Sequence, residues 1–105
     1  MTLNEIKSEI INNDIVLFMK GTPTFPQCGF SAYVISILDA EKVSYTSHDV
    51  LSYDELRINI KEYSNWPTIP QLYVKGEFIG GADIVHEMAD SGELSRILQP
   101  QVYGF

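Results

Sequence analysis

The stretch Lys20-Gly-Thr-Pro-Thr-Phe-Pro-Gln-Cys-Gly-Phe-Ser31 separates an apolar run from an amphipathic one and contains Cys28, the only cysteine of the chain. The run before it, Ile15-Val-Leu-Phe-Met19, is short and wholly apolar, which is typical of a strand covered on both faces. After it, the spacing of apolar side chains predicts a helix to about Glu41. The side chains of this expected inner face are Phe30, Tyr33, Val34, Ile37 and Leu38.

The position of Cys28, just before this helix, predicts a reactive thiol. The first amides of a helix have no backbone partner, and the aligned peptide dipoles favour negative charge, so a thiolate is stabilised there. The alternative is a small buried hydrophobe, which is what an unpaired cysteine most often is. Pro23, Pro26 and Gly29 leave the backbone around the thiol open, and they favour the reactive interpretation.

Length and composition limit the class of protein. The 105 residues predict a single domain, 1–105, with a core of its own. One cysteine forbids an internal disulfide and indicates a reducing compartment. Fourteen acidic against seven basic side chains give a net charge of −7, the wrong sign for nucleic acid or anionic lipid, so we expect neither nucleic acid nor membrane as a partner.

The N-terminus resembles neither a secretory signal nor a transit peptide, and the longest apolar run is far short of a membrane span. We therefore expect a cytoplasmic protein, or one of the mitochondrial matrix if a transit peptide has been removed.

Outside the Cys28 region, the pattern predicts alternating helices and strands. Capping-box spacings at Thr2–Glu5 and Ser52–Glu55 predict the starts of the first and third helices. The expected elements are helices at 2–12, 29–41, 52–63, 82–91 and 93–98, with strands at 15–19, 44–48, 71–74 and 78–79. This order predicts an α/β fold, with a four-stranded mixed sheet and helices on both faces.

Three helices have an expected inward face. These faces are Leu3, Ile6, Ile10 and Ile11 in the first helix, Leu56, Ile60 and Tyr63 in the third, and Ile84, Val85, Met88 and Ala89 in the fourth.

Four motifs, in order and spacing, resemble those of the monothiol glutaredoxins of the Cys-Gly-Phe-Ser type, within the thioredoxin superfamily. The motifs are Lys20-Gly-Thr-Pro23, Cys28-Gly-Phe-Ser31, Trp66-Pro-Thr-Ile-Pro70 and Gly80-Gly-Ala-Asp83. The resemblance covers nearly the whole chain and implies a thioredoxin-like (glutaredoxin) fold. Its nearest departure is Ala82, where many members carry cysteine or another small residue; a position that offers backbone groups tolerates alanine.

The resemblance also implies a groove for glutathione beside Cys28. Lys20 and Arg57, and with less weight Lys61, would meet the carboxylate at the glycine end of the tripeptide. Each of these cations is otherwise an ordinary solvated surface charge. Phe30 would flank the thiol, whereas its helical spacing equally indicates a core position.

Two further segments are implicated through the resemblance. Ile69-Pro70 resembles the family's cis-proline segment, in which Ile69 would pair with the glutathione backbone as an added strand does; otherwise Pro70 starts an edge strand. Gly81, Ala82 and Asp83 open a helix whose free amides suit the γ-glutamyl carboxylate, while Asp83 would accept from the ligand's amine. The alternative for Asp83 is a helix N-cap.

The remaining candidate residues are expected to lie outside the site. Trp66 would anchor its loop. His48 and His86 show no zinc-ligand spacing with Cys28 and are interpreted as ordinary strand and helix residues.

A single thiol decides between two mechanisms. Ser31 occupies the position of the second cysteine of dithiol relatives, so the chain cannot resolve a mixed disulfide by itself. A [2Fe–2S] cluster takes four thiolates, which the resemblance implies come from Cys28 of two chains and one glutathione beside each. The leading hypothesis is therefore iron–sulfur cluster assembly and transfer, by a monomer that becomes a homodimer when loaded, with acceptor proteins and a BolA-like protein as partners. The alternative is a glutathione-dependent thiol–disulfide oxidoreductase that removes glutathione from proteins, an enzyme of weak activity at most.

Overall fold

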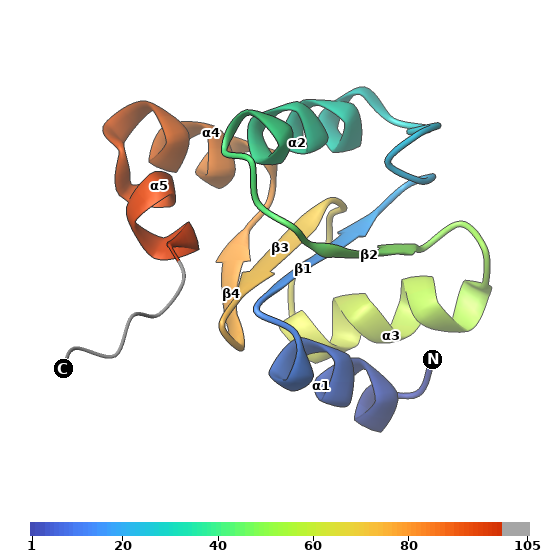
Figure 1. Ribbon diagram of the computed structural model, residues 1–105. Helices are drawn as coiled ribbons and strands as arrows, with labels where there is room; N and C mark the ends of the chain where they lie inside the picture. The colour runs from blue at the N-terminus through green and yellow to red at the C-terminus, as the bar shows by residue number, and fades with distance from the viewer. Residues whose placement is uncertain (100–105) are drawn as a thin grey trace, which may run out of the picture.

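A computed structural model describes residues 1–99 of the chain and has a four-stranded sheet between two layers of helices (Figure 1). The strands lie in the order β2-β1-β3-β4, and the predicted α/β architecture and order of elements are confirmed. The expected domain's last six residues, 100–105, lie outside the described part. The elements are α1 Leu3–Asn12, β1 Ile15–Met19, α2 Gly29–Ala40, β2 Thr46–Asp49, α3 Asp54–Ser64, β3 Gln71–Val74, β4 Glu77–Gly80, α4 Ala82–Ser91 and α5 Glu93–Leu98.

Strand β1 is an interior strand, as its apolar sequence predicts. It pairs parallel with β2 and antiparallel with β3, and all five of its residues are buried. Because successive side chains of a strand point to opposite faces, Leu17 contributes to one core and Phe18 to the other. The sheet is therefore mixed, with its β3–β4 hairpin on one side of β1.

Each face of the sheet is covered by its own helices. Figure 1 shows α2, α4 and α5 on one side and α1 with α3 on the other. The first core is Ile15, Leu17, Met19, Val34, Ile35, Leu38, Leu72, Val74, Val85, Leu94 and Leu98. The second is Ile6, Ile10, Val16, Phe18, Val50, Leu56, Ile60, Ile69 and Tyr73.

One of the two predicted capping boxes is confirmed. The Glu5 amide donates to Thr2 Oγ1 at 3.1 Å, and the Thr2 amide donates to Glu5 Oε1 at 2.9 Å. The predicted capping box at Ser52 is wrong, because the N-cap of α3 is Tyr53 and no side chain caps this helix. Ser52 instead belongs to the turn after β2, where its amide donates to the Asp49 carbonyl at 3.2 Å.

Several predicted inward positions are exposed. Leu3 and Ile11 lie outside the narrow buried stripe of α1, and Tyr63 and Ile84 lie at the edges of their helices. In α2 the buried face is rotated from the predicted one, so that Phe30 and Tyr33 are exposed. The buried residues of that helix are Ser31, Val34, Ile35 and Leu38.

Strand β2 starts two residues later than predicted, at Thr46. The preceding Val43 and Tyr45, which suggested an earlier start, pack against the first core from the connecting segment. The described residues include no helix with the length and apolar character needed to cross a bilayer.

Candidate functional site

The loop between β1 and α2 folds back on itself and returns the chain to the end of β1. The Gln27 amide donates to the Lys20 carbonyl at 2.9 Å, and Gly21 forms an isolated antiparallel bridge with Pro26. Gly21 has φ +90°, and a Cβ at this position would lie 2.5 Å from the Phe25 carbonyl oxygen. Only glycine fits where the loop passes this close to itself. The same close approach brings Cys28, the residue after Gln27, beside Lys20.

Cys28 is the residue before the first turn of α2, with extended backbone angles. The amide of Ser31 is the largest influence that holds the pKa of the Cys28 thiol below its ordinary value. Partial burial opposes it, and the Phe30 amide, the charge of Lys20 and the Ser31 hydroxyl add to the lowering. The thiolate is thus favoured by the free donors of a helix start, which is the physical effect that the sequence indicated.

Ser31 has a second role in the same turn. Its side chain is fully buried, and its Oγ accepts a hydrogen bond of 3.1 Å from the Lys20 amide. The hydroxyl therefore joins the end of β1 to the first turn of α2, next to the thiol.

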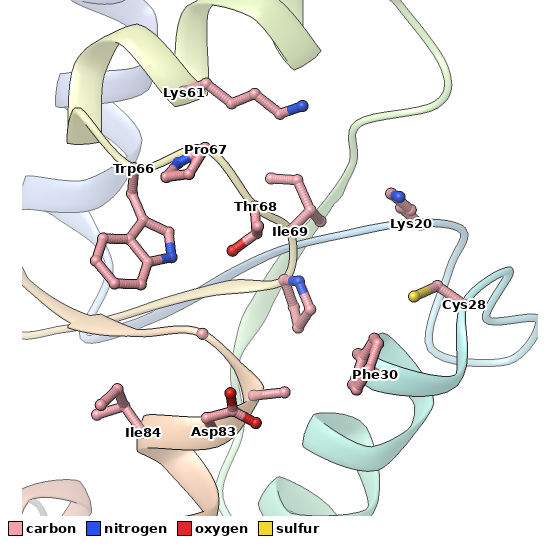
Figure 2. Close-up of a pocket in the computed structure, with 13 residues that line it drawn as sticks. Lys20, Cys28, Phe30, Lys61, Trp66, Pro67, Thr68, Ile69, Asp83 and Ile84 are labelled. Carbon is pink, nitrogen blue, oxygen red and sulfur yellow. The ribbon is translucent and has the colours of Figure 1, made fainter.

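The thiol opens onto a cleft of about 430 Å³, named here the Cys28 cleft. A volume of this size suits a small-molecule ligand. Its lining residues are Lys20, Cys28, Phe30, Lys61, Trp66, Pro67, Thr68, Ile69, Pro70, Gly81, Ala82, Asp83 and Ile84. In Figure 2 the sulfur of Cys28 points toward the side of the cleft occupied by Ile69.

The two ends of the Cys28 cleft differ in charge. Lys61 extends from α3 at one end, and Asp83 lies on α4 at the other, with the Ile69 segment between them in the view of Figure 2. Lys20 adds a second cation near the thiol. The cleft can therefore hold a ligand that carries an anionic group at one end and an amine at the other.

The Ile69-Pro70 peptide bond is cis, as the resemblance implied. Ile69 belongs to the second core and is only 7% exposed, yet it also lines the cleft. Pro70 lies immediately before β3 and lines the cleft.

Helix α4 presents its first turn to the same cleft. Its N-cap is Gly81, so the alternative interpretation of Asp83 as the N-cap is wrong. The Val85 amide donates to the Gly81 carbonyl at 3.0 Å, which leaves the amides of Ala82, Asp83 and Ile84 without an intrahelical acceptor. A Cβ at Gly81 would lie 3.3 Å from the Pro70 carbonyl oxygen, so the helix start approaches the proline segment closely.

Comparisons with known proteins identify the family. The glutaredoxin family profile matches residues 15–79, more than half of the chain. The chain is 54% identical over 101 residues to monothiol glutaredoxin-5, mitochondrial, of Schizosaccharomyces pombe, covering 93% of this chain and 69% of that protein. The chain belongs to the glutaredoxin family.

Solved structures agree with this assignment. The solution structure of a monomeric truncated mutant of Trypanosoma brucei 1-C-Grx1 superposes with a TM-score of 0.85 at 46% identity, covering 93% of this chain and 89% of that chain. The crystal structure of a buckwheat glutaredoxin–glutathione complex has a TM-score of 0.81 at 23% identity, over 91% and 86% of the two chains. The buckwheat likeness supports the fold alone. This glutaredoxin is of the monothiol kind, with Ser31 closing its Cys-Gly-Phe-Ser motif.

The lining of the glutaredoxin's cleft differs from the prediction at Arg57 and Trp66. Arg57 does not line the Cys28 cleft, and its guanidinium lies 3.2 Å from Asp54 Oδ1, whereas Lys61, one turn further along α3, does line it. Trp66, expected to lie outside the site, is one of the lining residues. It packs against Phe78 with ring centroids 5.7 Å apart, so it anchors the loop as well.

Sequence reasoning missed several contributors to the glutaredoxin site, among them Pro67 and Ile84, which line the cleft. Thr68 lines the cleft from within the Trp66–Pro70 motif, where the motif itself was the available signal. Asp49 accepts from the Gly21 amide at 2.9 Å and so fixes the loop before Cys28. Nothing in the sequence marks that contact, since it joins positions 28 apart.

The two histidines lie in different surroundings. His48 Nε2 lies 2.9 Å from Glu9 Oε1, and its ring stacks on Phe18 with centroids 5.2 Å apart. His86 contacts Tyr33 across the α2–α4 interface. Within residues 1–99, no three His, Cys, Asp or Glu side chains gather as metal ligands.

Proposed function

We propose that this monothiol glutaredoxin, a single domain over residues 1–105, binds glutathione in the Cys28 cleft. Glutathione has two carboxylates, one amine and one thiol along an extended backbone. The cleft offers cations at one end, free helix amides with Asp83 at the other, and the thiol between them. This match of charge supports the proposal.

The glycine-end carboxylate would meet Lys20 and Lys61. Arg57 joins them once its guanidinium leaves Asp54, and this exchange is inexpensive because exposed ion pairs contribute at most about 1 kcal/mol. The proposal thus keeps Arg57 as an outer contact, with Lys61 as the closer one.

The rest of the tripeptide is assigned to the cis-proline segment and α4. The backbone of Ile69, before Pro70, would pair with the cysteinyl part as an added strand does. The γ-glutamyl carboxylate would sit at the amides of Ala82 and Asp83, next to Gly81. Phe30, 64% exposed, would flank the Cys28 thiol.

We further propose that the loaded protein is a carrier of a [2Fe–2S] cluster in iron–sulfur cluster assembly. Each chain has one cysteine and can supply one thiolate, so two chains and two bound glutathiones complete the four ligands. The apo protein would be a monomer and the loaded one a homodimer. Half of the ligands are then exchangeable, which suits transfer to acceptor proteins or to a complex with a BolA-like protein.

A free, ionised thiol persists in a reducing compartment. The cytoplasm and the mitochondrial matrix both satisfy this condition, and the S. pombe relative is named as mitochondrial. The proposal therefore extends to both compartments.

The observation that carries the proposal is the Cys28 thiol, with its lowered pKa, at the edge of a cleft of matching charge. Anaerobic incubation with iron, sulfide and glutathione should give brown dimers, detected by absorption and size-exclusion chromatography. Cys28→Ser should stay colourless and monomeric, as should the wild type when glutathione is omitted. A colourless wild type with all components present would contradict the carrier role.

The alternative function, a glutathione-dependent thiol–disulfide oxidoreductase, is favoured by the same lowered thiol pKa. In this reaction the Cys28 thiolate takes the glutathionyl group from a mixed disulfide, and a second thiol must then release it. Turnover of a glutathionylated peptide by protein that never binds iron would support this function over the carrier role.

A further inference from the structure

A second recess, of about 480 Å³, lies beside Cys28 and is named here the Tyr33 recess. It shares Cys28, Phe30, Ala82 and Asp83 with the Cys28 cleft, so the two hollows meet at the thiol. The residues that it adds are Gly29, Tyr33 and His86. None of these three added residues is assigned to a tripeptide in the Cys28 cleft, so their part of the recess stays available next to the shared residues.

Two polar groups in the wall of the Tyr33 recess, Tyr33 and His86, form a chain with Asp90, which lies behind His86 and outside the recess lining. The Tyr33 hydroxyl on α2 is hydrogen-bonded to His86 Nδ1 on α4, and His86 Nε2 lies 3.2 Å from Asp90 Oδ2. Because a carboxylate accepts only, Nε2 carries the proton of a neutral His86, and Nδ1 accepts from Tyr33. Serine hydrolases have the same order of groups: a carboxylate holds an imidazole, and the imidazole takes the proton of a hydroxyl.

All three groups are within reach of a solute. Tyr33 is 40% exposed, and the side chains of His86 and Asp90 are 50% and 73% exposed. Helices α2 and α4 pack against each other, which holds the chain of groups in place. The titratable groups around His86 are Tyr33 and Cys28 on the α2 side, Asp83 and Asp90 on α4, and its chain neighbour Glu87.

We propose that the Tyr33 recess receives the second thiol of the exchange reaction, and that Tyr33, backed by His86 and Asp90, takes the proton of that thiol. This inference rests on the oxidoreductase alternative of the proposed function. In dithiol relatives a second cysteine supplies the thiolate that resolves the mixed disulfide. Here an external thiol, deprotonated at Tyr33, would supply that thiolate. The substrate class is a small or peptidyl thiol, of which glutathione is the simplest.

The step balances as a thiol–disulfide exchange. The incoming thiol gives its proton to the Tyr33 oxygen as the Tyr33 proton moves to His86 Nδ1, and Asp90 faces the resulting imidazolium. The new thiolate attacks the glutathione sulfur, a disulfide forms between these two sulfurs, and the bond to Cys28 breaks. Cys28 leaves as the thiolate that its helix start favours, and His86 returns its proton to water through Tyr33.

The size of the effect is bounded by thiol ionisation. A free thiol with a pKa near 8.5 is about 3% ionised at pH 7, so complete local deprotonation raises the rate by at most about thirtyfold. Tyr33→Phe should therefore lower the rate of the step about tenfold at pH 7 and leave it unchanged near pH 9.5, where the thiol ionises without help.

The test is a single-turnover measurement on the purified full chain. The Cys28–glutathione mixed disulfide is prepared with oxidised glutathione, mixed with reduced glutathione at a series of pH values, quenched with acid and followed by mass spectrometry. For Tyr33→Phe and His86→Gln, the logarithm of the rate should rise with pH with a slope of about one below the pKa of the free thiol, while the wild type has a shallower slope. Tyr53→Phe, an exposed tyrosine outside both hollows, and Glu87→Gln are the matched controls and should follow the wild type.

Three outcomes would overturn the inference. They are equal rates for wild type and Tyr33→Phe at pH 7, a defect that persists near pH 9.5, and a wild-type mixed disulfide that glutathione does not release. Glutathione affinity and cluster absorption are measured on the same preparations. If the wild type does not bind glutathione or does not show cluster absorption, the proposed function is contradicted. If it does both but the predicted pH dependence of the rate is not found, only the role of the Tyr33 recess is contradicted.

Discussion

The amide of Gly21 donates a hydrogen bond of 2.9 Å to Oδ1 of Asp49, and this contact joins the loop before Cys28 to the end of β2. The same oxygen accepts from the Leu51 amide at 2.9 Å. One carboxylate therefore holds the turn after β2 and the loop that delivers the thiol.

Asp49→Ala should lower the free energy of unfolding by about 1–3 kcal/mol, since it leaves two backbone donors without their acceptor. It should also weaken glutathione binding, because Lys20 and Cys28 lie on either side of the released loop. Urea denaturation and calorimetric titration check the two effects.

Asp39→Ala, which removes an exposed carboxylate on α2, is the control and should change stability by less than about 0.5 kcal/mol. Equal losses of stability in both variants would contradict the role of Asp49 as the acceptor that holds the loop.

Ser31→Ala should raise the pKa of Cys28 and slow its reaction with iodoacetamide near neutral pH. The substitution removes a hydroxyl that lowers this pKa and that accepts from the Lys20 amide at 3.1 Å. The pH midpoint of alkylation should move up, while the plateau rate at high pH stays the same. Ser36→Ala, an exposed serine on the same helix, should keep the wild-type midpoint.

The lowered pKa of Cys28 also predicts a pH dependence of stability. The folded state holds the thiolate at lower pH than the unfolded chain does. The stabilising contribution is therefore fully present above the unfolded thiol pKa, near 8.5, and is lost as pH falls through the folded pKa. The difference in unfolding free energy between wild type and Cys28→Ser should increase with rising pH across this window; a difference that is constant with pH would show that the helix start does not stabilise the thiolate.

The core of the fold and the thiol site could be predicted because their signals are local. The apolar run of β1 and the position of Cys28 before α2 each lie within a few residues of chain, and both predictions agree with the structure. The relation of Tyr33 to His86 could not be predicted, since it depends on how α2 packs on α4, 53 residues away. The choice between Arg57 and Lys61 depends on the rotation of α3 relative to the cleft, and one turn of helical spacing leaves that rotation open.

Lys61→Met should weaken glutathione binding more than Arg57→Met. Lys61 lines the Cys28 cleft, whereas Arg57 has to leave Asp54 before it can meet a carboxylate. We expect a loss of about tenfold for Lys61, which is the usual value of a charge-assisted contact, and about two- to threefold for Arg57. Titration calorimetry at two salt concentrations checks this order, with Lys7→Met on α1 as the control. A larger loss for Arg57 would place the glycine end of the ligand nearer the N-terminal end of α3.

Gly81→Ala should separate ligand affinity from stability. The added methyl would lie 3.3 Å from the Pro70 carbonyl oxygen and 3.7 Å from Trp66 Nε1, between the proline segment and the free amides of α4. Since φ of Gly81 is −91°, the backbone tolerates alanine, and the loss of stability should stay near 1 kcal/mol. Glutathione affinity should fall more, because the methyl group lies beside Pro70, Trp66 and Thr68, which line the Cys28 cleft next to the helix start assigned to the γ-glutamyl carboxylate.

Gly92→Ala provides the opposite comparison. Gly92 has φ +82° and no neighbour within 4 Å of an added Cβ, and it lies at the C-terminal end of α4, away from the cleft. Alanine there should cost about 1–2 kcal/mol of stability through the left-handed backbone, with unchanged glutathione affinity. If both variants lose affinity in proportion to stability, the first turn of α4 has no direct role in binding the tripeptide, and its amides must be assigned to another partner.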